Sequence, residues 1–122
     1  MRILGFSRKW DKLKNDTFTT FRFKRRDADW FVGEVVQVVY KPRSKKRDIL
    51  GTAEIICKEP RGIVQEYNLD APKITEQEAK EDGFTDFAEM YNWLAKAYGF
   101  EAVNTRPMNK LTLRRILYEQ NV

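Results

Sequence analysis

The sequence predicts a small α+β domain that is mainly β, with a barrel of about five to six strands and two helices packed at its side. Runs of β-branched and aromatic residues in the first half of the chain, such as 34–40, favour strands. The stretch 75–99 instead carries helical caps and an apolar stripe with helical spacing. An antiparallel sheet that must hide its edges in so small a protein tends to close into a barrel.

Composition indicates one folded domain over residues 1–122. The chain is 42% hydrophobic and 13% aromatic, which is enough apolar material for a core and too much for a disordered chain. The sequence contains no internal repeat, linker or low-complexity tract that would divide it. A single domain is therefore expected.

Strand patterns in the first half of the chain fall at 2–7, 17–23, 34–40 and 50–58. Between the first two, Trp10 and Leu13 lie three residues apart, which suits one short helical turn over a core edge. Alternation along the second strand places Thr20 and Arg22 on the same face. These two polar side chains are therefore expected to point in one direction.

Glycine and proline residues mark an irregularity in the fourth predicted strand and its end. Gly51 is a candidate bulge position, and Pro60 and Gly62 are expected to end the strand. The segment 63–69 fits either a further strand or an extended crossing.

Helical signals begin at Thr75. The hydroxyl of Thr75 and the carboxylate of Glu78 match a capping box, in which each side chain accepts a hydrogen bond from the backbone N–H of the other residue. The helix that follows is expected to run to about Glu81 and to end near Gly83.

A second helix is predicted after Thr85, which we expect to cap it. Gly99 is placed to end this helix, the segment 101–108 is expected to be a loop, and 111–118 resumes strand character. The apolar residues of the helix recur with one-face spacing, at Phe87, Met90, Tyr91, Leu94, Ala95 and Tyr98.

The chain has no histidine and one cysteine, Cys57. An intrachain disulfide and a histidine-based triad are thereby excluded, and too few soft ligands remain for a zinc site. Cys57 lies in an apolar run and is expected to be a buried small hydrophobe. No segment reaches the roughly 18 apolar residues that span a membrane. We expect a cytoplasmic monomer with no cofactor, no metal and no membrane partner.

Positive charge is concentrated on both sides of the strand at 34–40. The net charge of +5 favours a polyanionic partner. The strand would separate the two basic segments by about 20 Å, so they can form either one patch or two. Alternatively, their charge serves only to keep the protein soluble. Trp30, beside the first segment, is the candidate for stacking on a base. The basic residues are Lys24, Arg25, Arg26, Lys41, Arg43, Lys45, Lys46 and Arg47.

Four segments together resemble the ASCH family, a branch of the PUA-like superfamily. Segment 17–22 (TFTTFR) is similar to the family's Lys-x-x-Thr-x-Arg strand, 33–38 (GEVVQV) and 51–55 (GTAEI) are similar to two other strands, and 79–84 (AKEDGF) is similar to a helix end. The resemblance implies a PUA-like β-barrel with a cleft between the barrel and the helices. It also implies RNA binding and, in a few members, amidohydrolase activity on modified nucleosides.

The resemblance suggests roles for individual residues. Thr20 and Arg22 would face the cleft and bind RNA or a nucleotide-like ligand. In the amidohydrolases the first residue of the strand motif is a catalytic lysine, whereas here Thr17 occupies that position and Lys14 lies three residues before it. Asp82 falls near the family's acidic catalytic position, so Thr20 and Asp82 are the candidates for catalysis.

We therefore predict a domain that binds RNA or a nucleotide-like ligand through a basic cleft. A small amidohydrolase acting on a modified nucleoside is the alternative, and Thr17 in the lysine position favours binding over catalysis. A third hypothesis is a protein-interaction module that has no nucleic-acid ligand and whose charge serves solubility.

Overall fold

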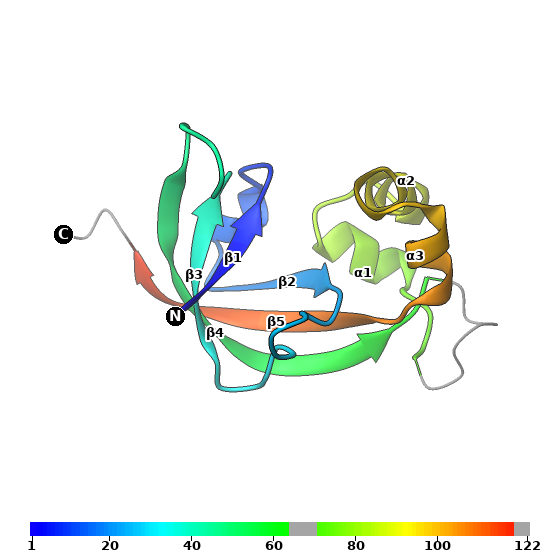
Figure 1. The fold of residues 1–122 in the computed structure, drawn as a ribbon, viewed down its shortest axis with the longest axis horizontal. Coiled ribbons are helices and arrows are strands. Elements are labelled where there is room, and N and C mark those ends of the chain that lie inside the picture. Colours follow the sequence, from blue (N-terminus) through cyan, green and yellow to red (C-terminus); the bar gives the residue numbers. More distant parts are fainter. Residues whose placement is uncertain (64–70, 119–122) are drawn as a thin grey trace.

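The computed structural model describes residues 1–63 and 71–118, which contain five strands, three α-helices and one 3-10 turn. Figure 1 shows the α-helices grouped at one end of the molecule. The strands are β1 (Arg2–Phe6), β2 (Thr17–Arg22), β3 (Val35–Tyr40), β4 (Asp48–Arg61) and β5 (Met108–Tyr118). The helical elements are η1 (Asp11–Lys14), α1 (Glu76–Glu81), α2 (Phe87–Tyr98) and α3 (Phe100–Thr105).

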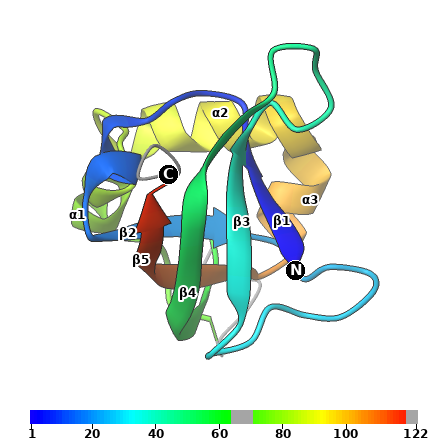
Figure 2. The same ribbon diagram turned by 90° about the vertical axis from the view of Figure 1, so that its left-hand side faces the viewer.

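The strands form one mixed sheet in the order β1-β3-β4-β5-β2. β1 runs parallel to β3, and all other neighbours are antiparallel. The predicted α+β, mainly β class is thereby confirmed. β1 and β2 are the two edges, and no strand pairing within the described ranges joins them, so the sheet is open. Figure 2 shows β1 and β3 standing across the direction of β2 and β5, which makes the sheet strongly curved.

Irregular pairing along β4 accounts for this curvature. Val38 pairs with Gly51 and Val39 with Ile49, which leaves Leu50 as an extra residue on β4. The bulge therefore lies at Leu50, directly before Gly51, where it was expected. Two further register shifts interrupt the pairing of β4 with β5. Extra residues of this kind increase the local twist and bend the strand.

The ends of two strands differ from expectation. β4 does not end at Pro60 but continues to Arg61, because only β5 pairs with it there and a proline is tolerated where one side of a strand has no partner. β5 begins at Met108, three residues before the predicted start at 111. The strand or crossing expected at 63–69 lies, except for residue 63, outside the described residues.

The N-terminal cap of α1 is the predicted one, whereas that of α2 is the neighbouring residue. In α1 the capping box is confirmed: the Glu78 N–H donates to the Thr75 hydroxyl and the Thr75 N–H donates to the Glu78 carboxylate, each at 3.0 Å. In α2 the N-cap is Asp86 and not Thr85, because Asp86 has extended backbone and its carboxylate accepts the Glu89 N–H at 2.8 Å.

The segment 101–108, predicted as a loop, contains residues 101–105 of α3, so the described residues form three α-helices where two were predicted. A helix of six residues is too short to persist alone in water. Tertiary contacts stabilise it: Val103 is buried in the core, and the Tyr91 hydroxyl of α2 donates to the side-chain amide oxygen (Oδ1) of Asn104 at 2.9 Å. Gly99 separates α2 from α3 with a φ of +91°, which confirms the predicted end of α2.

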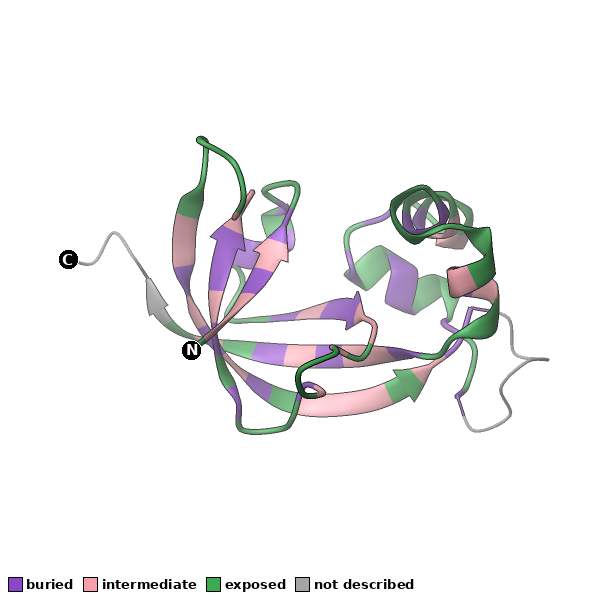
Figure 3. Ribbon diagram, viewed as in Figure 1, coloured by how far each residue is buried: buried purple, intermediate pink, exposed green. Residues whose placement is uncertain are grey.

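One hydrophobic core joins the sheet, the predicted helical turn η1 and the α-helices. Figure 3 shows buried residues alternating with less buried ones along much of the strands, as expected where one face of a sheet is covered. Trp10, just before η1, packs edge-on against Phe84 and Trp93 at centroid distances of 5.0 and 5.6 Å. The most deeply buried side chains include Leu4, Val36, Ile55, Met90, Val103, Leu111 and Leu113.

Candidate functional site

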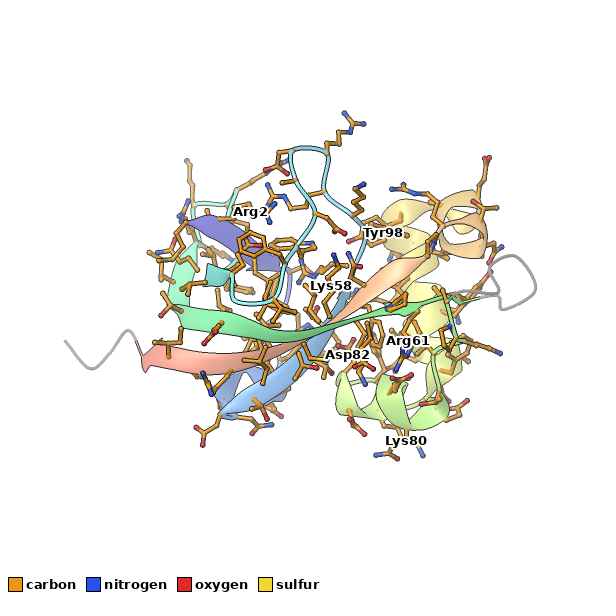
Figure 4. The ribbon with its side chains drawn as sticks, turned by 90° about the horizontal axis from the view of Figure 1, so that it is seen from below. Arg2, Lys58, Arg61, Lys80, Asp82 and Tyr98 are labelled. Carbon is orange, nitrogen blue, oxygen red and sulfur yellow. The ribbon has the colours of Figure 1, made fainter. Side chains whose placement is uncertain are left out.

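A pocket of about 300 Å³ lies between the sheet edges, η1 and α2. Thr20, Arg22 and Asp82, which the sequence analysis singled out, all line this pocket. Figure 4 shows Asp82 between β2 and α1. The structure therefore brings together three residues that lie up to 62 positions apart in the chain (82 − 20 = 62).

Arg22 connects the two edges of the open sheet. On β2, its Nε donates to the Thr20 hydroxyl at 3.1 Å, and its Nη2 reaches the carbonyl of Gly5 on β1 at 2.8 Å. The guanidinium also lies 4.7 Å from the ring centroid of Phe6. Burial lowers the pKa of Arg22, but an arginine stays protonated in a protein. A fixed positive charge therefore faces the pocket from the gap between the edges.

The turn after α1 positions Asp82. Asp82 is the C-terminal cap of α1, and Gly83 follows with a φ of +115°. A Cβ at position 83 would lie 2.7 Å from Trp10 Cε3, so only glycine allows the turn to approach the indole this closely. The turn therefore holds the Asp82 carboxylate against η1.

Lys12, on η1, is a pocket residue that the sequence analysis did not identify. Its Nζ donates to Asp82 Oδ1 at 2.5 Å and to the Thr19 carbonyl at 2.7 Å. The two charged side chains are only 7% and 9% exposed. Burial lowers the pKa of Lys12 and raises the pKa of Asp82, in each case against the effect of the partner's charge. The two pKa values are thus shifted toward each other, which suits a group that exchanges a proton.

The resemblance directed attention to other positions. Thr17, which occupies the family's lysine position, is exposed at the start of β2, and Lys14 is exposed on η1. Lys12 carries no distinguishing signal, because a lysine in a short polar turn is usually solvated. Only the packing of η1 against the end of α1 shows that an amine occupies the pocket after all.

Exposed aromatic rings line the outer part of the pocket. Trp93 and Tyr98 of α2 are 38% and 48% exposed. Trp30, the predicted stacking residue, is buried instead, with the guanidinium groups of Arg2 and Arg25 at 4.8 and 5.1 Å from its ring. Trp93 and Tyr98 are therefore the surfaces available to a planar ligand.

A second cavity of about 690 Å³ adjoins the pocket and shares Gly5, Arg22 and Tyr98 with it. Arg25 of the basic turn and Arg43 and Arg47 of the basic loop line it, and we call it the arginine groove. Figure 2 shows the segments 24–34 and 41–47 on the same side of the molecule, below and above β1. The two basic segments thus contribute to one site, which favours the single-patch interpretation.

Two contacts with β1 explain why these segments meet. Arg2 donates to the carbonyls of Ala28 and Asp29 at 2.6 and 3.0 Å and to both oxygens of Glu34, which holds the segment before β3 against β1. On the other side, Pro42 packs on Gly5, where an added Cβ would lie 2.9 Å from Pro42 Cγ.

The remaining basic residues lie elsewhere. Lys24, Arg26, Lys45 and Lys46 are exposed and do not line the groove. Lys41 is half-buried, with its Nζ 5.4 Å from the Tyr40 ring. Of the eight basic candidates, only Arg25, Arg43 and Arg47 therefore face a cavity next to Arg22.

Other chemistry has little support in the described ranges. They contain no cluster of three or more carboxylate or cysteine groups that could hold a metal ion. No helix in them has the length and apolar character needed to cross a bilayer. Cys57 is half-buried rather than buried, and burial together with Glu59, 3.5 Å away, raises its pKa, the opposite of what activates a thiol.

Comparison of the chain with models of known families, with curated proteins and with solved structures finds no match in any of the three. The functional assignment therefore rests on the chemistry of the pocket and of the arginine groove.

Proposed function

We propose that the protein binds RNA or a nucleotide-like ligand, with a nucleobase in the pocket. The observation that carries this proposal is the combination of buried polar groups and exposed rings in one cavity. Lys12, Arg22 and Asp82 offer donors and acceptors for the edge of a base, and Trp93 and Tyr98 offer faces on which it can stack. A nucleobase has the same two kinds of surface.

Energetics favour a functional role for this cluster. Taking two charges out of water costs several kcal/mol per ion, so a buried pair such as Lys12 and Asp82 contributes little to stability relative to apolar residues. Buried ionisable groups with shifted pKa values in a cleft are frequent at functional sites. Ligand binding gives a reason for keeping such a pair.

We also propose that the fold is ASCH-like and belongs to the PUA-like β-barrels. Two observations support this. Thr20, Arg22 and Asp82, which come from two of the four similar segments, line the same pocket. The Arg22 side chain bridges β2 and β1, the two edges that a barrel would bring together. The amine of Lys12 lies in the same pocket, although the sequence position of the family's lysine holds Thr17.

The binding proposal can be tested with Tyr98→Ala. Nucleosides, nucleotides and short RNAs are titrated while the tryptophan fluorescence of the protein is recorded. We expect at least one of them to bind and its affinity to fall about tenfold or more in Tyr98→Ala, since base–aromatic stacking contributes about 1–3 kcal/mol.

The matched control is Phe100→Ala, which removes a more exposed ring that does not line the pocket. Phe100→Ala should leave the affinity unchanged. Absence of binding by the whole panel, or equal losses in the two variants, would contradict the proposal.

A second candidate function is hydrolysis of an acylated nucleoside. It is favoured by the 2.5 Å contact between Lys12 and Asp82 in the pocket that Thr20 also lines. The pair can take a proton from attacking water, or from the Thr20 hydroxyl, and return it to the leaving nitrogen. With water as the nucleophile, the acyl C–N bond would then break to give a carboxylate and a free amine. With the Thr20 hydroxyl as the nucleophile, the same bond would break to give the amine and a Thr20 ester, which water would then hydrolyse to the carboxylate and the free hydroxyl.

The hydrolase candidate is tested with N-acylated nucleosides followed by chromatography. Replacement of both charges, in Lys12→Met/Asp82→Asn, should lower turnover about a hundredfold or more, the usual minimum for loss of acid–base catalysis. Lys14→Met, on the exposed side of the same turn, is the control and should retain turnover. Turnover that survives the double replacement would reject these catalytic roles.

A further inference from the structure

The arginine groove continues the pocket, and its position identifies the class of ligand. We infer that the groove binds a phosphate group attached to the nucleoside whose base occupies the pocket. This inference rests on the base-binding role proposed above. The ligand would then be a phosphorylated nucleotide, either free or at the end of an RNA strand, rather than a nucleoside.

The charged side chains that line the groove are all positive. Arginines from three separate segments line it, and no Asp or Glu is among its described lining residues. Among the described residues, only Arg25 of Arg25, Arg43 and Arg47 has a carboxylate contact, 3.2 Å from the exposed Asp27. The Arg43 side chain has no hydrogen bond or ion pair with any described residue, and the Arg47 side chain has only a 3.5 Å contact with the Pro42 carbonyl among them. Two guanidinium groups are thus available for an anion.

Arginine is well suited to phosphate. Its planar guanidinium donates two parallel N–H groups to phosphate oxygens and is less strongly hydrated than an ammonium group. Carboxylates can accept the same fork, but an acidic side chain carries no base for the adjoining pocket. A nucleotide satisfies both cavities with one molecule.

Arg22 lies at the junction of the two cavities. Its Nε and Nη2 are used by the Thr20 hydroxyl and the Gly5 carbonyl, whereas Nη1 makes no hydrogen bond within residues 1–63 and 71–118. The open donor lies where the sugar or first phosphate of a bound nucleotide would pass from pocket to groove.

The loop that carries Arg43 and Arg47 is anchored at its base. The Lys41 N–H donates to the Phe6 carbonyl at 2.8 Å, and Lys41 has a φ of +44° that turns the chain there. Pro42 follows, packed against Gly5 of β1. The two arginines therefore lie beside the groove, while Lys45 and Lys46 at the loop tip face solvent.

This division within one loop provides a charge-matched experiment. The affinities of a nucleoside, its monophosphate and a short RNA with a terminal phosphate are measured at low and moderate salt. Wild-type protein, Arg43→Ala/Arg47→Ala and Lys45→Ala/Lys46→Ala are compared, and both double variants remove the same charge. All substitutions are at exposed positions, and thermal unfolding verifies that each variant is folded.

We expect the wild type to bind the monophosphate about tenfold or more tightly than the nucleoside, because charge-assisted hydrogen bonds to phosphate are stronger than those between neutral groups. The arginine variant should lose this preference and much of the salt dependence. The lysine variant should keep the preference. Equal affinity of monophosphate and short RNA would identify a free nucleotide as ligand, and tighter binding of the RNA would identify a strand end; either result supports the inference.

The contrary outcomes separate the two proposals. Equal affinity of wild type for nucleoside and monophosphate would overturn the phosphate inference and leave base binding intact. A preference lost equally in the arginine and lysine variants would also overturn it. Absence of binding by nucleoside, monophosphate and RNA would overturn base binding and, with it, the inference.

Discussion

The Lys12–Asp82 contact is the most consequential pair of side chains in the molecule. Both groups are buried, and Lys12 has one further acceptor, the Thr19 carbonyl. A buried charge left without its partner is much more costly than the intact pair or than two neutral groups of similar volume. The pair therefore makes stability depend on which partner is removed and on pH.

We expect Lys12→Met to lower the free energy of unfolding by about 3–5 kcal/mol at neutral pH, because Asp82 then remains buried and unpaired. The loss should shrink in acid. The pKa of Asp82 in the folded state is raised above its ordinary value of 3.8. Between these two values the folded state binds a proton that the unfolded state does not, so stability rises as pH falls through this window.

Urea unfolding at a series of pH values from acidic to neutral measures this dependence. Lys12→Met/Asp82→Asn should recover most of the loss at neutral pH. A loss that does not vary with pH, or a double variant as unstable as the sum of the single variants, would show that the pair is not coupled as described.

At the scale of elements, the turn after α1 connects a helix end to the core. Gly83 allows the backbone to pass directly over the Trp10 ring, and Trp10 in turn packs against Phe84 and Trp93. A short helix and a 3-10 turn are thereby held at a fixed separation. The position of Asp82 in the pocket depends on this arrangement.

Gly83→Ala should lower the free energy of unfolding by about 1–3 kcal/mol and alter tryptophan fluorescence, because a methyl group would collide with Trp10 as well as strain the backbone. The control is Gly99→Ala. Gly99 also has a positive φ, +91°, but an added Cβ would meet nothing within 4 Å. It should therefore lose less stability and leave the fluorescence unchanged; equal effects would show that the collision is unimportant.

At the scale of the whole molecule, a buried carboxylate docks α1 on the far end of the sheet. Glu78 accepts from Arg61 of β4 at 3.1 Å and from Lys110 of β5 at 2.8 Å. Figure 4 shows Arg61 beside α1. Burial alone would raise the pKa of Glu78, but the hydrogen bonds from Lys110 and the Thr75 N–H outweigh it and lower the pKa. The folded state therefore depends on the ionised carboxylate.

Stability should accordingly fall as pH drops below 4.5, the ordinary pKa of glutamate, toward the lower pKa of Glu78 in the folded state. In this window the unfolded chain binds a proton that the folded protein does not. Glu78→Gln should reduce this acid-dependent loss of stability. Part of the loss should remain, because the pKa of Asp29 is also lowered in the folded state. Urea unfolding at several acidic pH values provides the measurement. Glu81→Gln, exposed on the same helix, should behave as wild type; a Glu78→Gln profile identical to it would refute the docking role.

Much of the fold was predictable because its signals are local. The strand at 34–40, the capping box of α1 and the end of α2 at Gly99 depend on residues only a few positions apart. α3 and the Asp86 cap were not predicted, because a short helix and the choice between adjacent caps are decided by packing against other elements.

The candidate site shows the same division. The sequence alone determined the mainly β class, the shared face of Thr20 and Arg22, and the excess of positive charge, since these follow from composition and two-residue alternation. Only the tertiary structure brought Lys12 to Asp82, 70 positions away, and folded both basic segments against β1. The physical reason is that such contacts depend on how curved strands and turns close distant parts of the chain together, and no short stretch of sequence encodes that closure.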